Sequence, residues 1–136
     1  MELVTGELVC PQNGYWECIC RSDSRNSDNI WLDCTFTVRF DPIDDLRASA
    51  ILNAFVPSAT NAISPLTRLS MNANRITRIP PEILLFDQLD LLDFYGNNVV
   101  SVAASDTFSL TEKLEYIDLS NNGLENIELG AFQGIQ

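Results

Sequence analysis

The sequence predicts an α/β fold: a short right-handed solenoid with a parallel sheet along its concave face and a disulfide-bonded cap at its N-terminal end. Three observations support this prediction. An apolar pattern recurs in the second half of the chain, all four cysteines lie in the first quarter, and a helical pattern lies between these regions. With 136 residues, the chain has room for one compact domain or a short repeat array.

The recurring pattern defines three repeats, over residues 66–88, 89–113 and 114–136. Each has the spacing L-x-x-L-x-L-x-x-N-x-L, which is the signature of leucine-rich repeats. The fourth and sixth positions alternate on a short strand and are expected to point into the core. Those residues are Leu69, Met71, Leu92, Phe94, Ile117 and Leu119. Asn74, Asn97 and Asn122 lie where each strand turns, and we expect them to form a buried, structural asparagine ladder.

The four cysteines are expected to form two disulfides in a cap over residues 1–40. They are Cys10, Cys18, Cys20 and Cys34. A zinc site with four thiolates usually has two C-x(2–4)-C pairs, which this spacing lacks. Disulfides indicate an oxidising compartment, so we expect an extracellular protein, either secreted or a cell-surface ectodomain. The first residues have no signal-peptide pattern, which favours a mature, trimmed or incomplete chain.

Residues 41–65 are expected to form a helical insert that joins the cap to the repeats. Asp41 would be the N-cap and Pro42 the first helical residue. The apolar stripe expected to pack beside the first repeat comprises Ile43, Leu46, Ala50, Ala54, Ile51 and Phe55. Before the insert, Ile30, Leu32 and Cys34 alternate with polar or larger residues, as in a capping strand that starts the sheet.

Composition excludes several classes of function. The net charge of −11 disfavours binding to nucleic acid or to anionic membranes. No apolar run reaches the roughly 18–20 residues of a membrane span. The absence of histidine removes the usual general base and all imidazole metal sites. We therefore expect no enzyme activity, no cofactor and no metal.

The strand positions that do not enter the core should form columns on the concave face, about 4.8 Å from strand to strand. The partner-binding residues predicted there are Arg68, Ser70, Leu91, Asp93, Tyr95, Tyr116 and Asp118. Exposed tyrosines beside charged groups favour recognition of another protein, with a basic partner among the candidates. A calcium site is disfavoured because Asp90, Asp93, Glu115 and Asp118 supply too few of the roughly six to eight oxygens required. Two alternatives stay open: a convex or lateral binding surface, or no partner beyond a missing C-terminal half.

The cysteine spacing Cys10-Pro11…Cys18-Ile19-Cys20…Cys34 resembles the N-terminal cap of secreted and cell-surface leucine-rich-repeat proteins. This resemblance implies the pairs Cys10–Cys20 and Cys18–Cys34. Receptor ectodomains of the Toll type and matrix proteoglycans share the same cap.

A narrower resemblance comes from the runs over residues 51–55, 64–67, 79–83, 86–89 and 130–134. They are similar to the non-catalytic leucine-rich-repeat subunit of shrimp luciferin monooxygenase. That resemblance implies an alternative role, as the partner subunit of a secreted oxidoreductase complex.

The chain stops without the C-terminal cap that such arrays usually carry, so we expect an incomplete array. The flank expected to be uncovered comprises Leu114, Ile117, Leu119, Leu124, Ile127 and Phe132. An uncovered flank of this kind would favour self-association through the last repeat.

Overall fold

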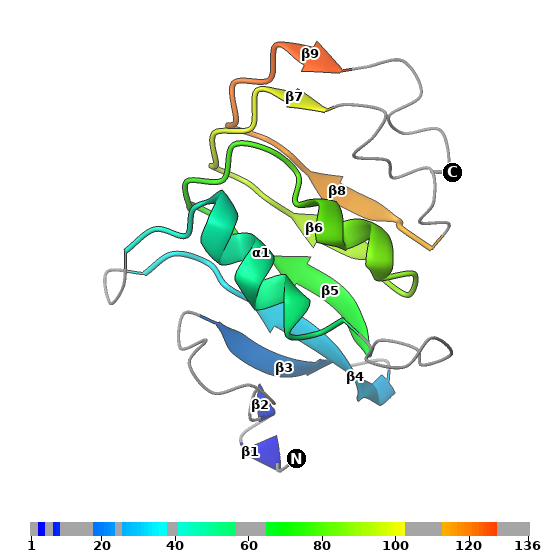
Figure 1. Cartoon of the computed structure of the whole chain (residues 1–136). Coiled ribbons are helices and arrows are strands. Elements are labelled where there is room, and N and C mark those ends of the chain that lie inside the picture. The colour runs from blue at the N-terminus through cyan, green and yellow to red at the C-terminus, as the bar shows by residue number, and fades with distance from the viewer. Residues whose placement is uncertain are drawn as a thin grey trace.

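The computed structural model describes residues 3–4, 7–8, 18–23, 26–37, 41–56, 65–102 and 113–127. Within them, the chain forms a seven-stranded sheet in the order β1-β2-β3-β4-β5-β6-β8 and a two-stranded sheet of β7 and β9 (Figure 1). The large sheet contains β1 (Leu3–Val4), β2 (Glu7–Leu8), β3 (Ile19–Asp23), β4 (Asn26–Asp33), β5 (Leu66–Ser70), β6 (Leu91–Asp93) and β8 (Tyr116–Asp118). The other elements are helix α1 (Asp45–Asn53), the 3-10 helix η1 (Pro81–Leu85), β7 (Ser101–Val102) and β9 (Asn126–Ile127).

The large sheet has an antiparallel half and a parallel half. Strands β1 to β4 pair antiparallel, whereas β4, β5, β6 and β8 pair parallel. The expectation that the strand ending near Cys34 starts the sheet is therefore wrong, because β3 pairs with its outer edge. Strands β3 and β4 are neighbours in sequence, which favours antiparallel pairing, whereas each parallel pair requires a long crossover.

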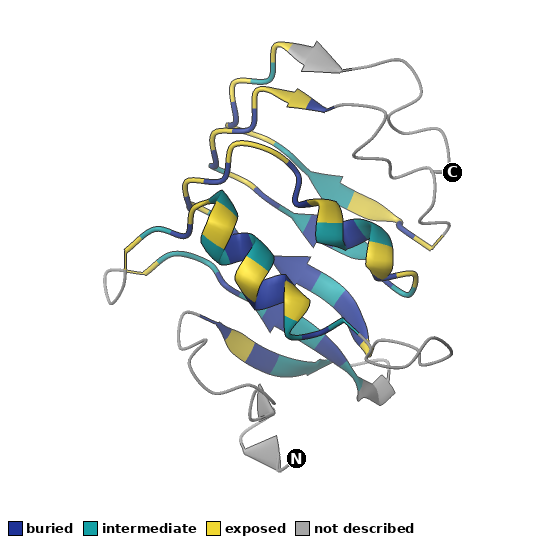
Figure 2. Cartoon of the chain, in the orientation of Figure 1, coloured by how far each residue is buried: buried dark blue, intermediate teal, exposed yellow. Residues whose placement is uncertain are grey.

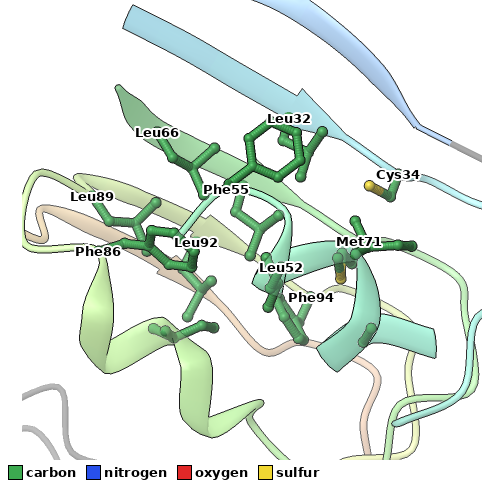
Figure 3. Packing of buried hydrophobic residues seen from close by; sticks show 14 of the residues in the cluster. Leu32, Cys34, Leu52, Phe55, Leu66, Met71, Phe86, Leu89, Leu92 and Phe94 are labelled. Atoms are coloured by element: carbon green, nitrogen blue, oxygen red, sulfur yellow. The ribbon is translucent and has the colours of Figure 1, made fainter. Parts of the chain in front are cut away.

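The core lies between the large sheet and the two helices. Leu32, Leu69 and Leu92 project from successive strands, and all three are fully buried. Leu52 of α1 and Phe86 after η1 close the core from the other side, as Figure 3 shows. Each such side chain contributes about 1.5–3 kcal/mol on full burial. In Figure 2 the exposed residues of α1 lie on the side turned away from the sheet.

Helix α1 begins later than the sequence pattern indicates. Its N-cap is Asp44, whose carboxylate accepts the backbone N–H of Arg47 at 2.9 Å, so Asp41 is not the N-cap. The buried residues of the helix are Ala48, Ile51 and Leu52. The predicted stripe is thus wrong at two positions: Leu46 is 84% exposed and Ala50 is also exposed.

The backbone of Ile43 explains this shift. Its N–H donates to Oδ1 of Asn74 at 2.8 Å, and its carbonyl accepts the N–H of Arg75 at 2.8 Å. Ile43 is buried, but these contacts with the first repeat hold it outside the helix. The helical turn can begin only after this residue, and its buried face rotates accordingly.

Three buried asparagines connect successive units in the same way. The Nδ2 groups of Asn74, Asn97 and Asn122 donate to carbonyl oxygens of the preceding unit at 2.9, 2.8 and 2.9 Å. Those carbonyls belong to Cys34, Met71 and Phe94, respectively. The Oδ1 atoms accept backbone N–H groups, also of the preceding unit, which belong to Ile43, Ile76 and Val99.

These contacts show that the segment before the first repeat occupies the position of a preceding repeat unit. Cys34 and Ile43 offer Asn74 the same carbonyl and N–H groups that Met71 and Ile76 offer Asn97. Strand β4 and helix α1 therefore belong to one unit that precedes the repeats, and residues 41–56 are its returning half. Residues 57–64 of the expected insert lie outside the described residues.

A disulfide between Cys18 and Cys34 lies within the predicted cap and joins the start of β3 to the unit formed by β4 and α1. It ties the residue before β3 to the residue after β4, beside the first asparagine. Cys20 is also disulfide-bonded, and its expected partner, Cys10, lies outside the described residues.

The last described repeat is less completely buried than the one before it. Ile117, Leu119 and Leu124 are only partly buried. Their counterparts in the preceding repeat, Leu92, Phe94 and Val99, are fully buried. The side chains of Ile127 and Phe132 lie outside the described residues, and self-association through this flank stays a prediction.

Replacement of Asn97 by Ala should lower the free energy of unfolding by about 1–3 kcal/mol, because buried backbone groups of two units lose their partners. Urea denaturation measures this change. Asn98→Ala is the matched control, since Asn98 is the next residue, has the same side chain and is exposed. Equal effects of the two substitutions would contradict the ladder.

The residue before each ladder asparagine has a positive φ: 60° at Ala73, 74° at Gly96 and 58° at Asn121. Gly96→Ala should lower the free energy of unfolding by about 1 kcal/mol, because an L side chain is strained there. The cost should come from the backbone alone, since an added Cβ would be 3.6 Å from its nearest neighbours.

Ala73→Gly is the converse experiment at the equivalent turn. It should raise the free energy of unfolding by up to about 1 kcal/mol, as relief of strain outweighs the added freedom of the unfolded chain. Thermal or urea melts that rank the two substitutions in the opposite order would contradict a shared left-handed turn.

Candidate functional site

The strand register aligns the predicted binding residues in two rows across the large sheet. Pairing connects Trp31 to Arg68, Arg68 to Leu91 and Leu91 to Tyr116 in one row. The second row, two residues further along each strand, connects Asp33, Ser70, Asp93 and Asp118. Their neighbours Leu32, Leu69 and Leu92 enter the core, so both rows lie on the opposite face. We call these two rows, together with Tyr95, the open face.

Trp31 and Asp33 belong to this face but were not among the predicted binding residues. Both come from β4, which the sequence pattern assigned to the cap. Their alternation with buried Ile30 and Leu32 was the available signal. Extending each predicted column by one strand would have found them.

At the cap end of the open face, the side chain of Trp31 covers Ser70 on the neighbouring strand. Its indole Nε1–H donates to Oγ of Ser70 at 3.0 Å, and Ser70 is only 4% exposed. The guanidinium carbon of Arg68 lies 5.8 Å from the centroid of the Trp31 ring, within the range of a cation–π contact. Ser70 is therefore not accessible as a contact residue, contrary to the sequence prediction. Its local pattern could not show that a residue of another strand covers it.

The two arginines of this region have carboxylate neighbours. Nε of Arg68 lies 3.6 Å from Oδ1 of Asp90, and Nε of Arg21 lies 3.6 Å from Oδ2 of Asp33. Charges of opposite sign thus accompany each other at the cap end of the open face. Of the predicted residues, Arg68 and Ser70 lie in this self-contacting part.

The part of the open face on β6 and β8, which we call its distal end, is more accessible to solvent than the cap end. Tyr95 is 44% exposed and Tyr116 is 49% exposed, while Leu91, Asp93 and Asp118 are partly exposed. Tyr116 precedes the aspartate row on β8, and Tyr95 follows that row after β6. The aspartates therefore lie between two exposed tyrosines. The structure brings five of the seven predicted residues together here.

Local hydrogen bonds orient this distal end. The backbone N–H of Tyr95 donates to Oδ1 of Asn72 at 3.0 Å and to Oδ1 of Asp93 at 3.3 Å, and Oδ2 of Asp93 accepts a hydrogen bond from Nδ2 of Asn72 at 3.0 Å. Oδ1 of Asp118 accepts the backbone N–H of Ser120 at 2.8 Å. Each aspartate thus caps the end of its own strand. The phenol oxygen of Tyr95 accepts a hydrogen bond from Nδ2 of Asn121 at 2.6 Å, which joins two repeats.

The electrostatics of the distal end are negative. Among the described residues, no ion pair involves Asp93, Glu115 or Asp118. The charge of Asp118 is the main cause that raises the pKa of Tyr116 above 10.0, with smaller contributions from burial and from Asp93. The pKa of Asp118 is lowered, mainly by hydrogen bonds from the side chain and then the backbone of Ser120.

The acidic residues do not converge on a metal position. Within the described part of the chain, no group of three or more histidine, cysteine, aspartate or glutamate side chains could hold a metal ion. The described helices are also too short and too polar to cross a membrane.

Asp118→Asn should lower the pKa of Tyr116 toward 10.0, because the neighbouring negative charge that opposes phenolate formation is removed. A pH titration of the tyrosine ring carbons by NMR, assigned with Tyr116→Phe, measures the shift. Asp87→Asn removes an exposed carboxylate outside the open face and serves as the control. An unchanged titration of Tyr116 in Asp118→Asn would contradict the electrostatic cause.

Comparison with known proteins identifies the repeat. Residues 113–135 match the family model described as Leucine Rich Repeat. Neither the curated proteins nor the solved structures contain a match to this chain. The matched segment includes Tyr116, Asp118 and the ladder residue Asn122, and the described part of it supplies β8 to the parallel half of the sheet. The repeat match and the α/β architecture with its parallel strands support a leucine-rich-repeat protein.

Proposed function

We propose that this protein is an extracellular, non-catalytic interaction module that binds another protein through the distal end of its open face. The repeat match supports a protein-interaction module in general terms. Repeat folds of this kind curve so that the open face becomes concave, and partners commonly bind on such a surface.

The proposed location of the binding surface rests on one observation: the two ends of the open face differ in the accessibility of their side chains. At the cap end, Trp31 contacts both Arg68 and Ser70. At the distal end, Tyr95 and Tyr116 remain 44% and 49% exposed. Tyrosines provide a large contact area at a small entropic cost, and they are enriched among residues that dominate binding energy.

The distal end is also held in place before any partner arrives. The hydrogen bond from Asn121 fixes the phenol of Tyr95, and the capping contacts fix Asp93 and Asp118. Side chains already ordered in the free protein lose less entropy on association. This preorganisation favours a recognition surface over a merely solvated one.

The extracellular setting is supported by the disulfide between Cys18 and Cys34, since such bonds persist in oxidising compartments. The same setting makes secreted or cell-surface proteins the natural partners. The non-catalytic role is supported by the lack of histidine, which removes the usual general base.

Photocrosslinking tests the location of the binding surface. A photoreactive phenylalanine analogue would replace Tyr95 or Tyr116 and, as a control, Leu85, which is 54% exposed on η1. In the extracellular fluid of the source organism, positions 95 and 116 should crosslink to the same protein, and position 85 should not. A partner captured from position 85 alone would move the site off the open face.

Truncation then measures the contribution of each tyrosine. Tyr95→Ala and Tyr116→Ala should each weaken binding of the crosslinked partner by more than about 1 kcal/mol, as expected for central aromatic contacts. Leu85→Ala should have little effect. Calorimetric titration of the purified proteins measures the affinities, and melting curves confirm that each variant is folded.

A further inference from the structure

One cationic side chain of the open face already lies between an aromatic ring and a carboxylate. At the cap end, the guanidinium of Arg68 lies over the ring of Trp31 and beside the carboxylate of Asp90. An aromatic face and a carboxylate thus hold the same arginine. Arginine suits such a position because its planar cation stacks on rings and pairs with carboxylates.

The distal end offers the same two kinds of group. Asp93 and Asp118 are register partners on adjacent strands, and neither forms an ion pair with a described residue. Tyr116 and Tyr95 lie on either side of this aspartate row and are exposed. No described residue supplies the cation that would complete the arrangement.

Asp93 and Asp118 place two negative charges side by side on neighbouring strands. Neighbouring strands are about 4.8 Å apart, and like charges directly opposite each other are destabilising. The raised pKa of Tyr116 reflects the same local negative potential, since both Asp118 and Asp93 contribute to it. A cation placed between the two carboxylates would interact favourably with both.

We infer that the distal end of the open face binds a basic segment of the partner protein, with an arginine or lysine side chain seated on the Asp93–Asp118 row between Tyr95 and Tyr116. This inference rests on the proposed function and specifies the chemistry of the partner. The charged head pairs with the carboxylates, while the aliphatic stem lies against the tyrosines and Leu91. A nucleic acid would be repelled by the net charge of −11.

A displayed library of random dodecapeptides, selected against the immobilised full chain, tests this chemistry. Selected peptides should be enriched in arginine or lysine. Asp93→Asn/Asp118→Asn should weaken their binding by about 10-fold or more, since it removes both charges of the row. Asparagine retains one oxygen that can accept the capping N–H group, while the contact of Nδ2 of Asn72 with Oδ2 of Asp93 is lost. A melting curve verifies that this variant is folded.

The control variant is Asp41→Asn/Asp87→Asn. It changes the net charge by the same amount at two exposed positions outside the open face. Its affinity for the selected peptides should equal that of the unaltered chain. An equal loss of affinity in both double variants would show a general charge effect and overturn the inference.

The remaining outcomes separate this inference from the proposed function. Selected peptides that are neutral or acidic, and that depend on Tyr95 and Tyr116, would overturn the cationic partner but leave the binding surface in place. Peptides insensitive to both the tyrosines and the aspartates would overturn the inference and the proposed surface together. A selection without any enrichment would also overturn the basic-segment inference.

Discussion

Each ladder asparagine lies where its strand has ended and the chain turns. Its side-chain amide there forms the hydrogen bonds to the preceding unit that the backbone of a continuing strand would form. The side chain of Asn97 donates to the carbonyl of Met71 in the preceding unit and accepts the N–H of Ile76 from the same unit. Asn74 and Asn122 repeat this arrangement. The distance and register between units are fixed by these contacts, so the alignment of side chains across the parallel half of the sheet depends on them.

The cap is tied to the repeats through the same interaction. Cys34 provides the carbonyl that Asn74 requires, and the Cys18–Cys34 disulfide holds that residue in place. Ile43 provides the matching N–H, so helix α1 starts immediately after a residue fixed by the first repeat. The N-terminal region therefore acts as the unit on which the parallel half of the sheet is built. A region with little core of its own gains stability in this way.

The uneven distribution of charge along the open face follows from this order of strands. Strand β4 carries Trp31 into line with Arg68, and their contact occupies the cap end. Further along the sheet, the same rows contain Asp93 and Asp118 with tyrosines on either side. Positive charge is thus accompanied by carboxylates near the cap, whereas negative charge lacks a described ion-pair partner at the distal end. Adjacent stretches of one surface differ in exposure and in charge because their neighbours along the sheet differ.

The sequence by itself determined which residues share a row, because a fixed repeat period places equivalent positions side by side. The neighbours Asp93 and Asp118 and the inward position of Asn97 follow from that period alone. Only the tertiary structure decided the start and buried face of α1, since contacts of Ile43 with the first repeat override the local helical pattern. It also decided that Ser70 is covered, because the indole of Trp31 reaches it from a strand 39 residues earlier. Periodicity specifies positions within a repeat, whereas coverage depends on which segment lies next to it in space.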